Sequence, residues 1–146
     1  MEAYSERYEA ALAMAARTHR DQTRKASDVP YIVHLAHVSV ILIRHGFGED
    51  LAIAGLLHDA VEDQDLPLVE VEAADTLHTV RSLLAGLAEH GPAHWSRFSR
   101  GPDQSLWFYE SVAEIVRERL AAHPLADELD RAVDALEEAI AAGEDR

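Results

Sequence analysis

The most informative stretch of the chain is Gly55-Leu56-Leu57-His58-Asp59-Ala60-Val61-Glu62-Asp63. It closes a predicted helix over Glu49–Glu62, which is acidic at its start and apolar on nearly all sides. A helix that is apolar all round is buried at the centre of a protein. The stretch therefore predicts a central helix that carries a His-Asp pair and two further carboxylates near its end.

The sequence around this helix is also helical in pattern. Apolar residues recur at helical spacing, and no segment shows the sustained two-residue alternation of a half-buried strand. The other predicted helices are Ser5–Gln22 with Ser5 as N-cap, Pro30–Gly46 with Gly46 as C-cap, Leu68–His90, Gln104–His123 and Pro124–Ala142. Gly91–Asp103, with two Gly and two Pro, is predicted as a loop. We therefore expect an all-α fold.

Length and composition narrow the class of protein. With 146 residues, 48% of them apolar, the chain is expected to form one domain over residues 1–146. The sequence contains no run of about 20 apolar residues, the length that a membrane-spanning helix requires. Its N-terminus is acidic, whereas a signal peptide would be basic there. We therefore expect a cytoplasmic protein without a membrane partner. Cysteine is absent, so any metal must be held by nitrogen and oxygen.

The charge distribution favours a small ligand over a polyanion. The formal net charge of -14 argues against nucleic-acid binding, which depends on clustered Lys and Arg. Four basic residues nevertheless fall in one short stretch: Arg17, Arg20, Arg24 and Lys25, the only lysine. Such a cluster can attract a small phosphorylated ligand, because the local field matters more to a cleft than the net charge. For Arg17 and Arg20 alone, a solvated helix end is an equally good interpretation.

Three predicted helices offer side chains that could bind a metal: His34 on the second, His58 with Asp59 on the third, and Asp75 on the fourth. Imidazole and carboxylate without thiolate suit Mn, Fe, Co, Zn or Mg. Asp59 lies seven residues before the predicted turn near Leu66, and Asp75 lies nine residues after it. If this turn joins antiparallel helices, the two carboxylates lie at similar heights along the helix axes. The spacing therefore predicts a shared metal site.

Glu62 and Asp63 lie three and four residues beyond Asp59, about one helical turn further along. A carboxylate there could orient or deprotonate an attacking water, as hydrolysis of a phosphate ester requires. The alternative is a solvent-exposed carboxylate pair at a helix end. Other His side chains are expected to be structural: His37 and His78 as partly buried residues, and His45, His90, His94 and His123 in capping or solvation.

Together these segments resemble the HD hydrolase domain of RelA/SpoT-type enzymes and of their small single-domain relatives. The matching pieces are 16–19 with Gln22, Arg24-Lys25, 30–34, 55–63 and 74–81. The resemblance implies a helical bundle of the HD type. It further implies the following roles: His34, His58, Asp59 and Asp75 as ligands of a divalent metal, usually Mn²⁺; Glu62 and Asp63 as the groups that activate water; and Arg24 and Lys25 as nucleotide contacts.

The family reaction is removal of the 3′-pyrophosphate from ppGpp or pppGpp, and some small relatives act on other phosphorylated nucleotides, including NADPH. The segment between Asp63 and Asp75 is shorter here than in the family. Thr79 takes the place of an Asn that helps to hold the nucleotide, so we expect looser discrimination between guanine and adenine. Two alternatives stay open: a broader HD-type nucleotide phosphatase, and a catalytically silent nucleotide-binding module.

Overall fold

The computed structural model describes residues 5–60 and 69–144, and the regular elements in this part of the chain are helices, apart from one isolated β-bridge. They are α1 (Glu6–Thr18), α2 (Tyr31–Arg44), α3 (Glu49–Leu57), α4 (Val69–His90), the 3₁₀ helix η1 (Gly91–Arg97), α5 (Pro102–Leu120) and α6 (Pro124–Glu144). The expected all-α fold is confirmed. The chain divides into two compact units, residues 1–75 and 76–146. The organisation of residues 1–146 as a single domain stays a prediction.

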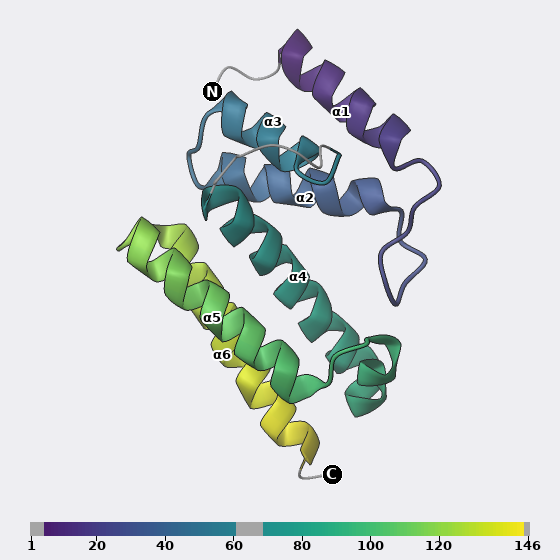
Figure 1. The fold of residues 1–146 in the computed structure, drawn as a ribbon, viewed down its shortest axis with the longest axis vertical. Coiled ribbons are helices and arrows are strands. Elements are labelled where there is room, and N and C mark those ends of the chain that lie inside the picture. The colour runs from purple at the N-terminus through teal and green to yellow at the C-terminus, as the bar shows by residue number, and fades with distance from the viewer. Residues whose placement is uncertain (1–4, 61–68, 145–146) are drawn as a thin grey trace. The chain divides into compact units, whose positions relative to one another are not determined.

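The first unit is built around α3, which packs against both α1 and α2 (Figure 1). One cluster of its buried side chains consists of Ala11, Ala15, Leu35 and Leu56. Gly55 faces α2, where a Cβ atom would lie 2.9 Å from Leu42 Cδ1. The absence of a side chain at this position therefore allows the closest approach of α2 and α3.

Both predicted caps in this unit are confirmed. The Ser5 side chain accepts a hydrogen bond from the backbone N–H of Tyr8 at 3.1 Å, which satisfies a free donor of the first turn. Gly46 follows α2 with a φ of +80°, and its N–H donates to the Ile43 carbonyl. The N–H of Phe47 reaches back to the carbonyl of residue 42, which completes a Schellman motif. The sequence signals thus define where the helices begin and end.

The third helix corrects the prediction. It ends at Leu57, and residues 58–60 form a turn, so His58 and Asp59 follow the helix and do not lie within it. The His58 ring Nδ1 donates to the Gly55 carbonyl at 2.8 Å. That oxygen would accept the backbone N–H of Asp59 in a continuing helix. The imidazole therefore takes over the bond that would have extended α3.

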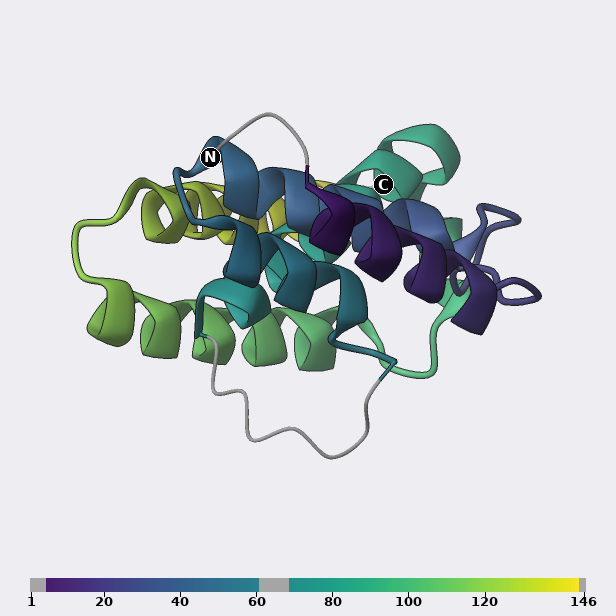
Figure 2. The same ribbon diagram turned by 90° about the horizontal axis from the view of Figure 1, so that it is seen from above.

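The first helix is also shorter than predicted, because it ends at Thr18 and not at Gln22. Its connection to α2 extends beyond the helices of this unit (Figure 2). The base of this loop is held by an isolated β-bridge between Thr23 and Pro30. The N–H of Arg24 also donates to the Val29 carbonyl at 2.9 Å. These bonds fix the backbone that carries the predicted substrate contacts.

In the second unit α5 and α6 pack against each other, with Leu125, Leu129 and Leu136 of α6 fully buried. Arg81 links α4 to α6 through an ion pair with Glu128 at 2.8 Å. The first part of the predicted loop over Gly91–Asp103 is the helix η1, and α5 already begins at Pro102. A proline lies in the first turn of η1, where a missing N–H breaks no helical bond. Across the described residues, no helix is long and apolar enough to cross a membrane.

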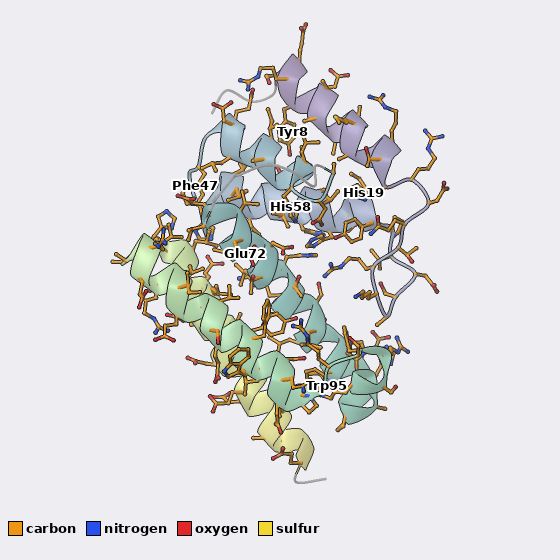
Figure 3. All side chains as sticks on the ribbon, viewed as in Figure 1. Tyr8, His19, Phe47, His58, Glu72 and Trp95 are labelled. Atoms are coloured by element: carbon orange, nitrogen blue, oxygen red, sulfur yellow. The ribbon has the colours of Figure 1, made fainter. Side chains whose placement is uncertain are left out.

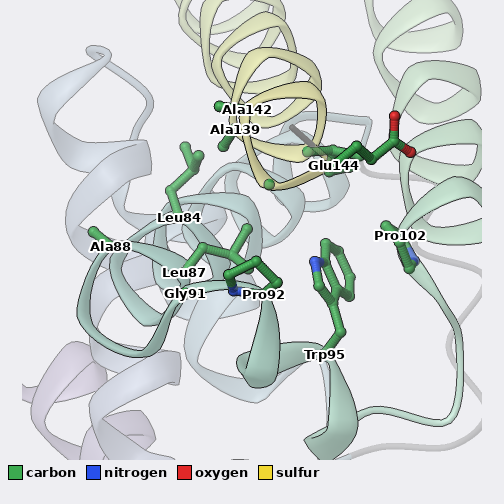
Figure 4. Close-up of a pocket in the computed structure, with 12 residues that line it drawn as sticks. Leu84, Leu87, Ala88, Gly91, Pro92, Trp95, Pro102, Ala139, Ala142 and Glu144 are labelled. Carbon is green, nitrogen blue, oxygen red and sulfur yellow. The ribbon is translucent and has the colours of Figure 1, made fainter. Parts of the chain in front are cut away.

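This unit also contains a largely apolar cavity of about 400 Å³ (Figure 4). Trp95 and Pro92 of η1 line it together with residues of α4 and α6, and Glu144 is the one ionisable lining residue. A cavity with a single carboxylate cannot assemble a metal site or an acid–base pair.

Gly86 provides a test of packing in the second unit. A Cβ atom there would lie 2.1 Å from Nε2 of His94. The His94 side chain is only 7% exposed, so the prediction of a capping or solvation role for it is wrong. We predict that Gly86→Ala lowers the free energy of unfolding by roughly 1–3 kcal/mol. This outcome would outweigh the gain of about 1 kcal/mol that alanine normally brings to a helix. Chemical denaturation measures the difference.

The same substitution made in a His94→Ala background serves as the control. Without the ring, the new methyl group has space, so Gly86→Ala should become neutral or stabilising there. A stabilising effect of Gly86→Ala in the otherwise unchanged protein would contradict this packing.

Candidate metal centre

Three of the four predicted metal ligands converge in the first unit. They come from α2, from the turn after α3 and from α4, and they are His34, His58 and Asp75. One ligand atom from each lies within 4.8 Å of the other two. The Nε2 atom of His34 is 2.8 Å from Asp75 Oδ1, and that of His58 is 3.6 Å from the same oxygen. The cluster therefore centres on one carboxylate oxygen.

The two imidazoles are held by different means. His34 is 1% exposed and lies in α2 beside the core residue Leu35. His58, labelled in Figure 3, is held by the bond from its Nδ1 to the Gly55 carbonyl. Because a carbonyl oxygen only accepts, Nδ1 must carry the hydrogen, which directs Nε2 toward the carboxylates. This is how an imidazole is oriented for metal ligation in proteins.

Asp59 borders this cluster. Its Oδ2 atom lies 3.3 Å from Nε2 of His58 and accepts a hydrogen bond of 2.5 Å from the hydroxyl of Tyr31. The side chain is 37% exposed, more than that of Asp75 at 29%. Asp59 and Asp75 therefore both approach the same imidazole nitrogen, although Asp59 lies outside the tight group of three.

The chemistry of these groups fits a divalent cation. Nε2 of His58 is buried and makes no hydrogen bond, although two carboxylates lie near it. Burial lowers the pKa of His58, but Asp75, the Gly55 carbonyl and Asp59 outweigh it and raise the pKa to about 9. Burial raises the pKa of Asp75, but the bond to His34 and the nearby imidazole of His58 outweigh it and hold the pKa well below its usual range. A cation could replace the proton that this arrangement stabilises.

The remaining predicted site residues are distributed as follows. The Arg24 guanidinium lies over the Tyr31 ring, 5.9 Å from its centroid, and Lys25 is exposed in the same loop. Glu62 and Asp63 lie outside the described residues. Thr79 is half-buried on α4 and belongs to the second unit. The structure thus places Arg24 near the candidate centre. The roles predicted for Arg24, Lys25, Glu62, Asp63 and Thr79 stay predictions.

Tyr31 is the site residue that the sequence analysis did not single out. Its ring lies 5.1 Å from that of His19 and 5.4 Å from that of His34, between centroids. Burial raises the pKa of Tyr31, and the bond to Asp59 raises it further, so the hydroxyl is protonated and donates at neutral pH. Its spacing was the available signal: Tyr31 lies three residues before His34, on the same side of a helix.

Comparison with known families identifies the fold type. The HD domain family matches residues 11–96, which include His34, His58, Asp59 and Asp75. The match covers more than half of the chain.

Among curated relatives, the human guanosine-3′,5′-bis(diphosphate) 3′-pyrophosphohydrolase MESH1 is 48% identical over 61 residues, which is 40% of this chain and 34% of MESH1. The enzyme of the same activity from Aquifex aeolicus is 35% identical over 69 residues, or 47% of this chain and 10% of the relative. A GTP pyrophosphokinase of Streptomyces coelicolor is 44% identical over 63 residues, or 43% and 7%. The resemblance to RelA/SpoT-type proteins is confirmed. The matched segment spans 34% of MESH1 and a tenth or less of the other two relatives.

The raised pKa of His58 gives a prediction for cation binding. At pH 7 the imidazole carries a proton, because pH 7 lies below its pKa of about 9, and a cation bound by Nε2 must displace that proton. We expect about one proton to be released per cation, and the affinity to increase as the pH rises from 6 to 8. Calorimetry with Mn²⁺ in two buffers of different ionisation enthalpy counts the protons. Binding without proton release would contradict ligation by His58.

Proposed function

Because the chain belongs to the HD domain family, we propose that it is a metal-dependent phosphohydrolase that removes the 3′-pyrophosphate from ppGpp or pppGpp. The observation that carries the proposal is the convergence of His34, His58 and Asp75 in the first unit. The choice of substrate is supported by the two relatives named as 3′-pyrophosphohydrolases. We further propose that residues 1–146 act as one domain in the cytoplasm.

The proposed cofactor is Mn²⁺, held by His34, His58, Asp75 and, as fourth ligand, Asp59. Two imidazoles and two carboxylates without a thiolate suit this ion. A divalent cation at this position would supply Lewis-acid polarisation of a phosphoryl oxygen and would lower the pKa of water. The Nε2 atom of His58 supports this assignment, because this buried nitrogen makes no hydrogen bond and lies near the carboxylates of Asp59 and Asp75.

We assign the proton transfer to Glu62 and Asp63. In the proposed reaction an oxygen of water forms a bond to phosphorus, and the bond between that phosphorus and the ribose 3′ oxygen breaks. One carboxylate accepts the proton of the attacking water, and the released ribose 3′ oxygen takes up a proton to become a hydroxyl. From ppGpp the products are therefore GDP and pyrophosphate. The assignment rests on the sequence, since both residues lie outside the described part of the chain.

Arg24 and Lys25 are the proposed contacts of the substrate phosphates, with Thr79 as a further contact of the nucleotide. Arg24 contacts the ring of Tyr31, whose hydroxyl bonds Asp59, so one cation of this loop lies beside the candidate centre. In a protein of net charge -14, such a local cation favours a small phosphorylated nucleotide over a nucleic acid.

Turnover of three substrates by the Mn²⁺-loaded protein tests the function. We expect release of pyrophosphate from ppGpp, with little phosphate released from NADPH or from a simple aryl phosphate. As a control, Glu62→Gln should keep the metal while kcat falls by about 10² or more, because a positioned general base is lost. Phosphate release from all three substrates would favour the broader phosphatase. Nucleotide binding without turnover would favour the silent module.

Lys25 should act on substrate binding. Lys25→Ala is expected to raise KM for ppGpp about 10-fold or more without loss of metal, because a charge-assisted bond to phosphate is removed. The matched control is Arg20→Ala, which removes another exposed cation from the same part of the chain. Steady-state kinetics of both variants distinguishes a specific contact of Lys25 with phosphate from a general effect of positive charge. Equal effects would show that only the general charge of this region matters.

A further inference from the structure

Tyr31 connects parts of the candidate site that are distant in sequence. Its hydroxyl contacts Asp59, its ring faces the guanidinium of Arg24, and its other neighbours are His19 and His34. We propose that Tyr31 is a positioning residue with two separable roles: the hydroxyl orients the Asp59 carboxylate toward the metal, and the ring supports Arg24 at the substrate phosphates. The inference rests on the proposed function and deepens it.

The hydroxyl matters because it gives the Asp59 carboxylate a hydrogen-bond partner from another element of the structure. Asp59 lies in the turn after α3, beyond the last residue of the helix, and its side chain is 37% exposed. An exposed carboxylate in a turn can rotate among several rotamers. The bond from the Tyr31 hydroxyl to Oδ2 selects one of these orientations while Oδ2 stays 3.3 Å from Nε2 of His58.

The ring is itself fixed in place, so it can act as a support. The N–H of Tyr31 donates to the Gln22 carbonyl at 2.9 Å, which ties the first residue of α2 to the preceding loop. The rings of His19 and His34 lie against the tyrosine ring, and both histidines are buried. A cation over the face of a fixed aromatic ring is attracted by its quadrupole. The Arg24 guanidinium is therefore positioned by a rigid neighbour.

Two substitutions separate these roles. Tyr31→Phe removes the hydroxyl and keeps the ring, so it should weaken Mn²⁺ binding about 10-fold or more, the usual scale for loss of a group that orients a ligand, and leave KM nearly unchanged. Tyr31→Leu removes both, so it should weaken Mn²⁺ binding to a similar extent and also raise KM. The readouts are the Mn²⁺ dissociation constant by calorimetry, and KM at saturating Mn²⁺.

A matched control exists in the same unit. The hydroxyl of Tyr8 bonds the Ser39 hydroxyl at 2.8 Å, away from Asp59 and Arg24. Tyr8→Phe thus removes one partly buried hydrogen bond without touching the candidate site. We expect it to lower the melting temperature about as much as Tyr31→Phe does, with the Mn²⁺ dissociation constant unchanged.

The outcomes distinguish this inference from the proposed function. If the unaltered protein binds Mn²⁺ and Tyr31→Phe binds it equally well, the positioning role is wrong while the metal site stands. If both tyrosine-to-phenylalanine variants weaken Mn²⁺ alike, the effect reflects stability, and the inference is again overturned. If the unaltered protein binds no Mn²⁺, both the proposed function and the inference are wrong. Weaker Mn²⁺ binding in Tyr31→Phe alone, with KM altered only in Tyr31→Leu, supports both roles.

Discussion

The imidazole of His34 is almost completely buried, with 1% of its surface exposed, and its Nε2 atom lies 2.8 Å from the carboxylate of Asp75. A polar ring can be buried in this way only when its nitrogens find partners, because an unsatisfied buried group costs roughly 1–3 kcal/mol. Asp75 meets this need from the start of α4 and stays ionised as it does so. The arrangement of the candidate centre depends on this contact, since His58 approaches the same carboxylate oxygen.

In the first unit, local contacts at the end of α3 position two candidate metal ligands. Gly55 contributes twice: it lets α2 and α3 approach closely, and its carbonyl accepts the hydrogen bond that ends α3 and orients His58. Ending the helix there places Asp59 in a turn, where it meets the hydroxyl of Tyr31. The hydrogen bond to the Gly55 carbonyl therefore orients His58 and, because α3 ends there, leaves Asp59 outside the helix.

Electrostatics explains how an acidic protein can have a place for a negatively charged substrate. The candidate centre collects carboxylates around imidazoles, and this arrangement stabilises a positive charge, whether a proton or a metal ion. The loop before α2 then brings Arg24 against Tyr31, next to Asp59. A bound divalent cation and a neighbouring guanidinium would offset the negative charge of these carboxylates. The net charge of -14 thus describes the surface as a whole and not the site.

The sequence by itself determined the features that depend on local pattern and residue type. Helical spacing predicted the all-α fold, and single residues such as Ser5 and Gly46 predicted helix ends, because capping depends on one side chain or one φ angle. Residue type also singled out His34, His58 and Asp75 as potential ligands. Only the tertiary structure decided which groups meet. Tyr31 and Asp59 are 28 residues apart, and His94 is buried against Gly86, because contacts between distant residues follow from how helices pack, which the period of each helix does not specify.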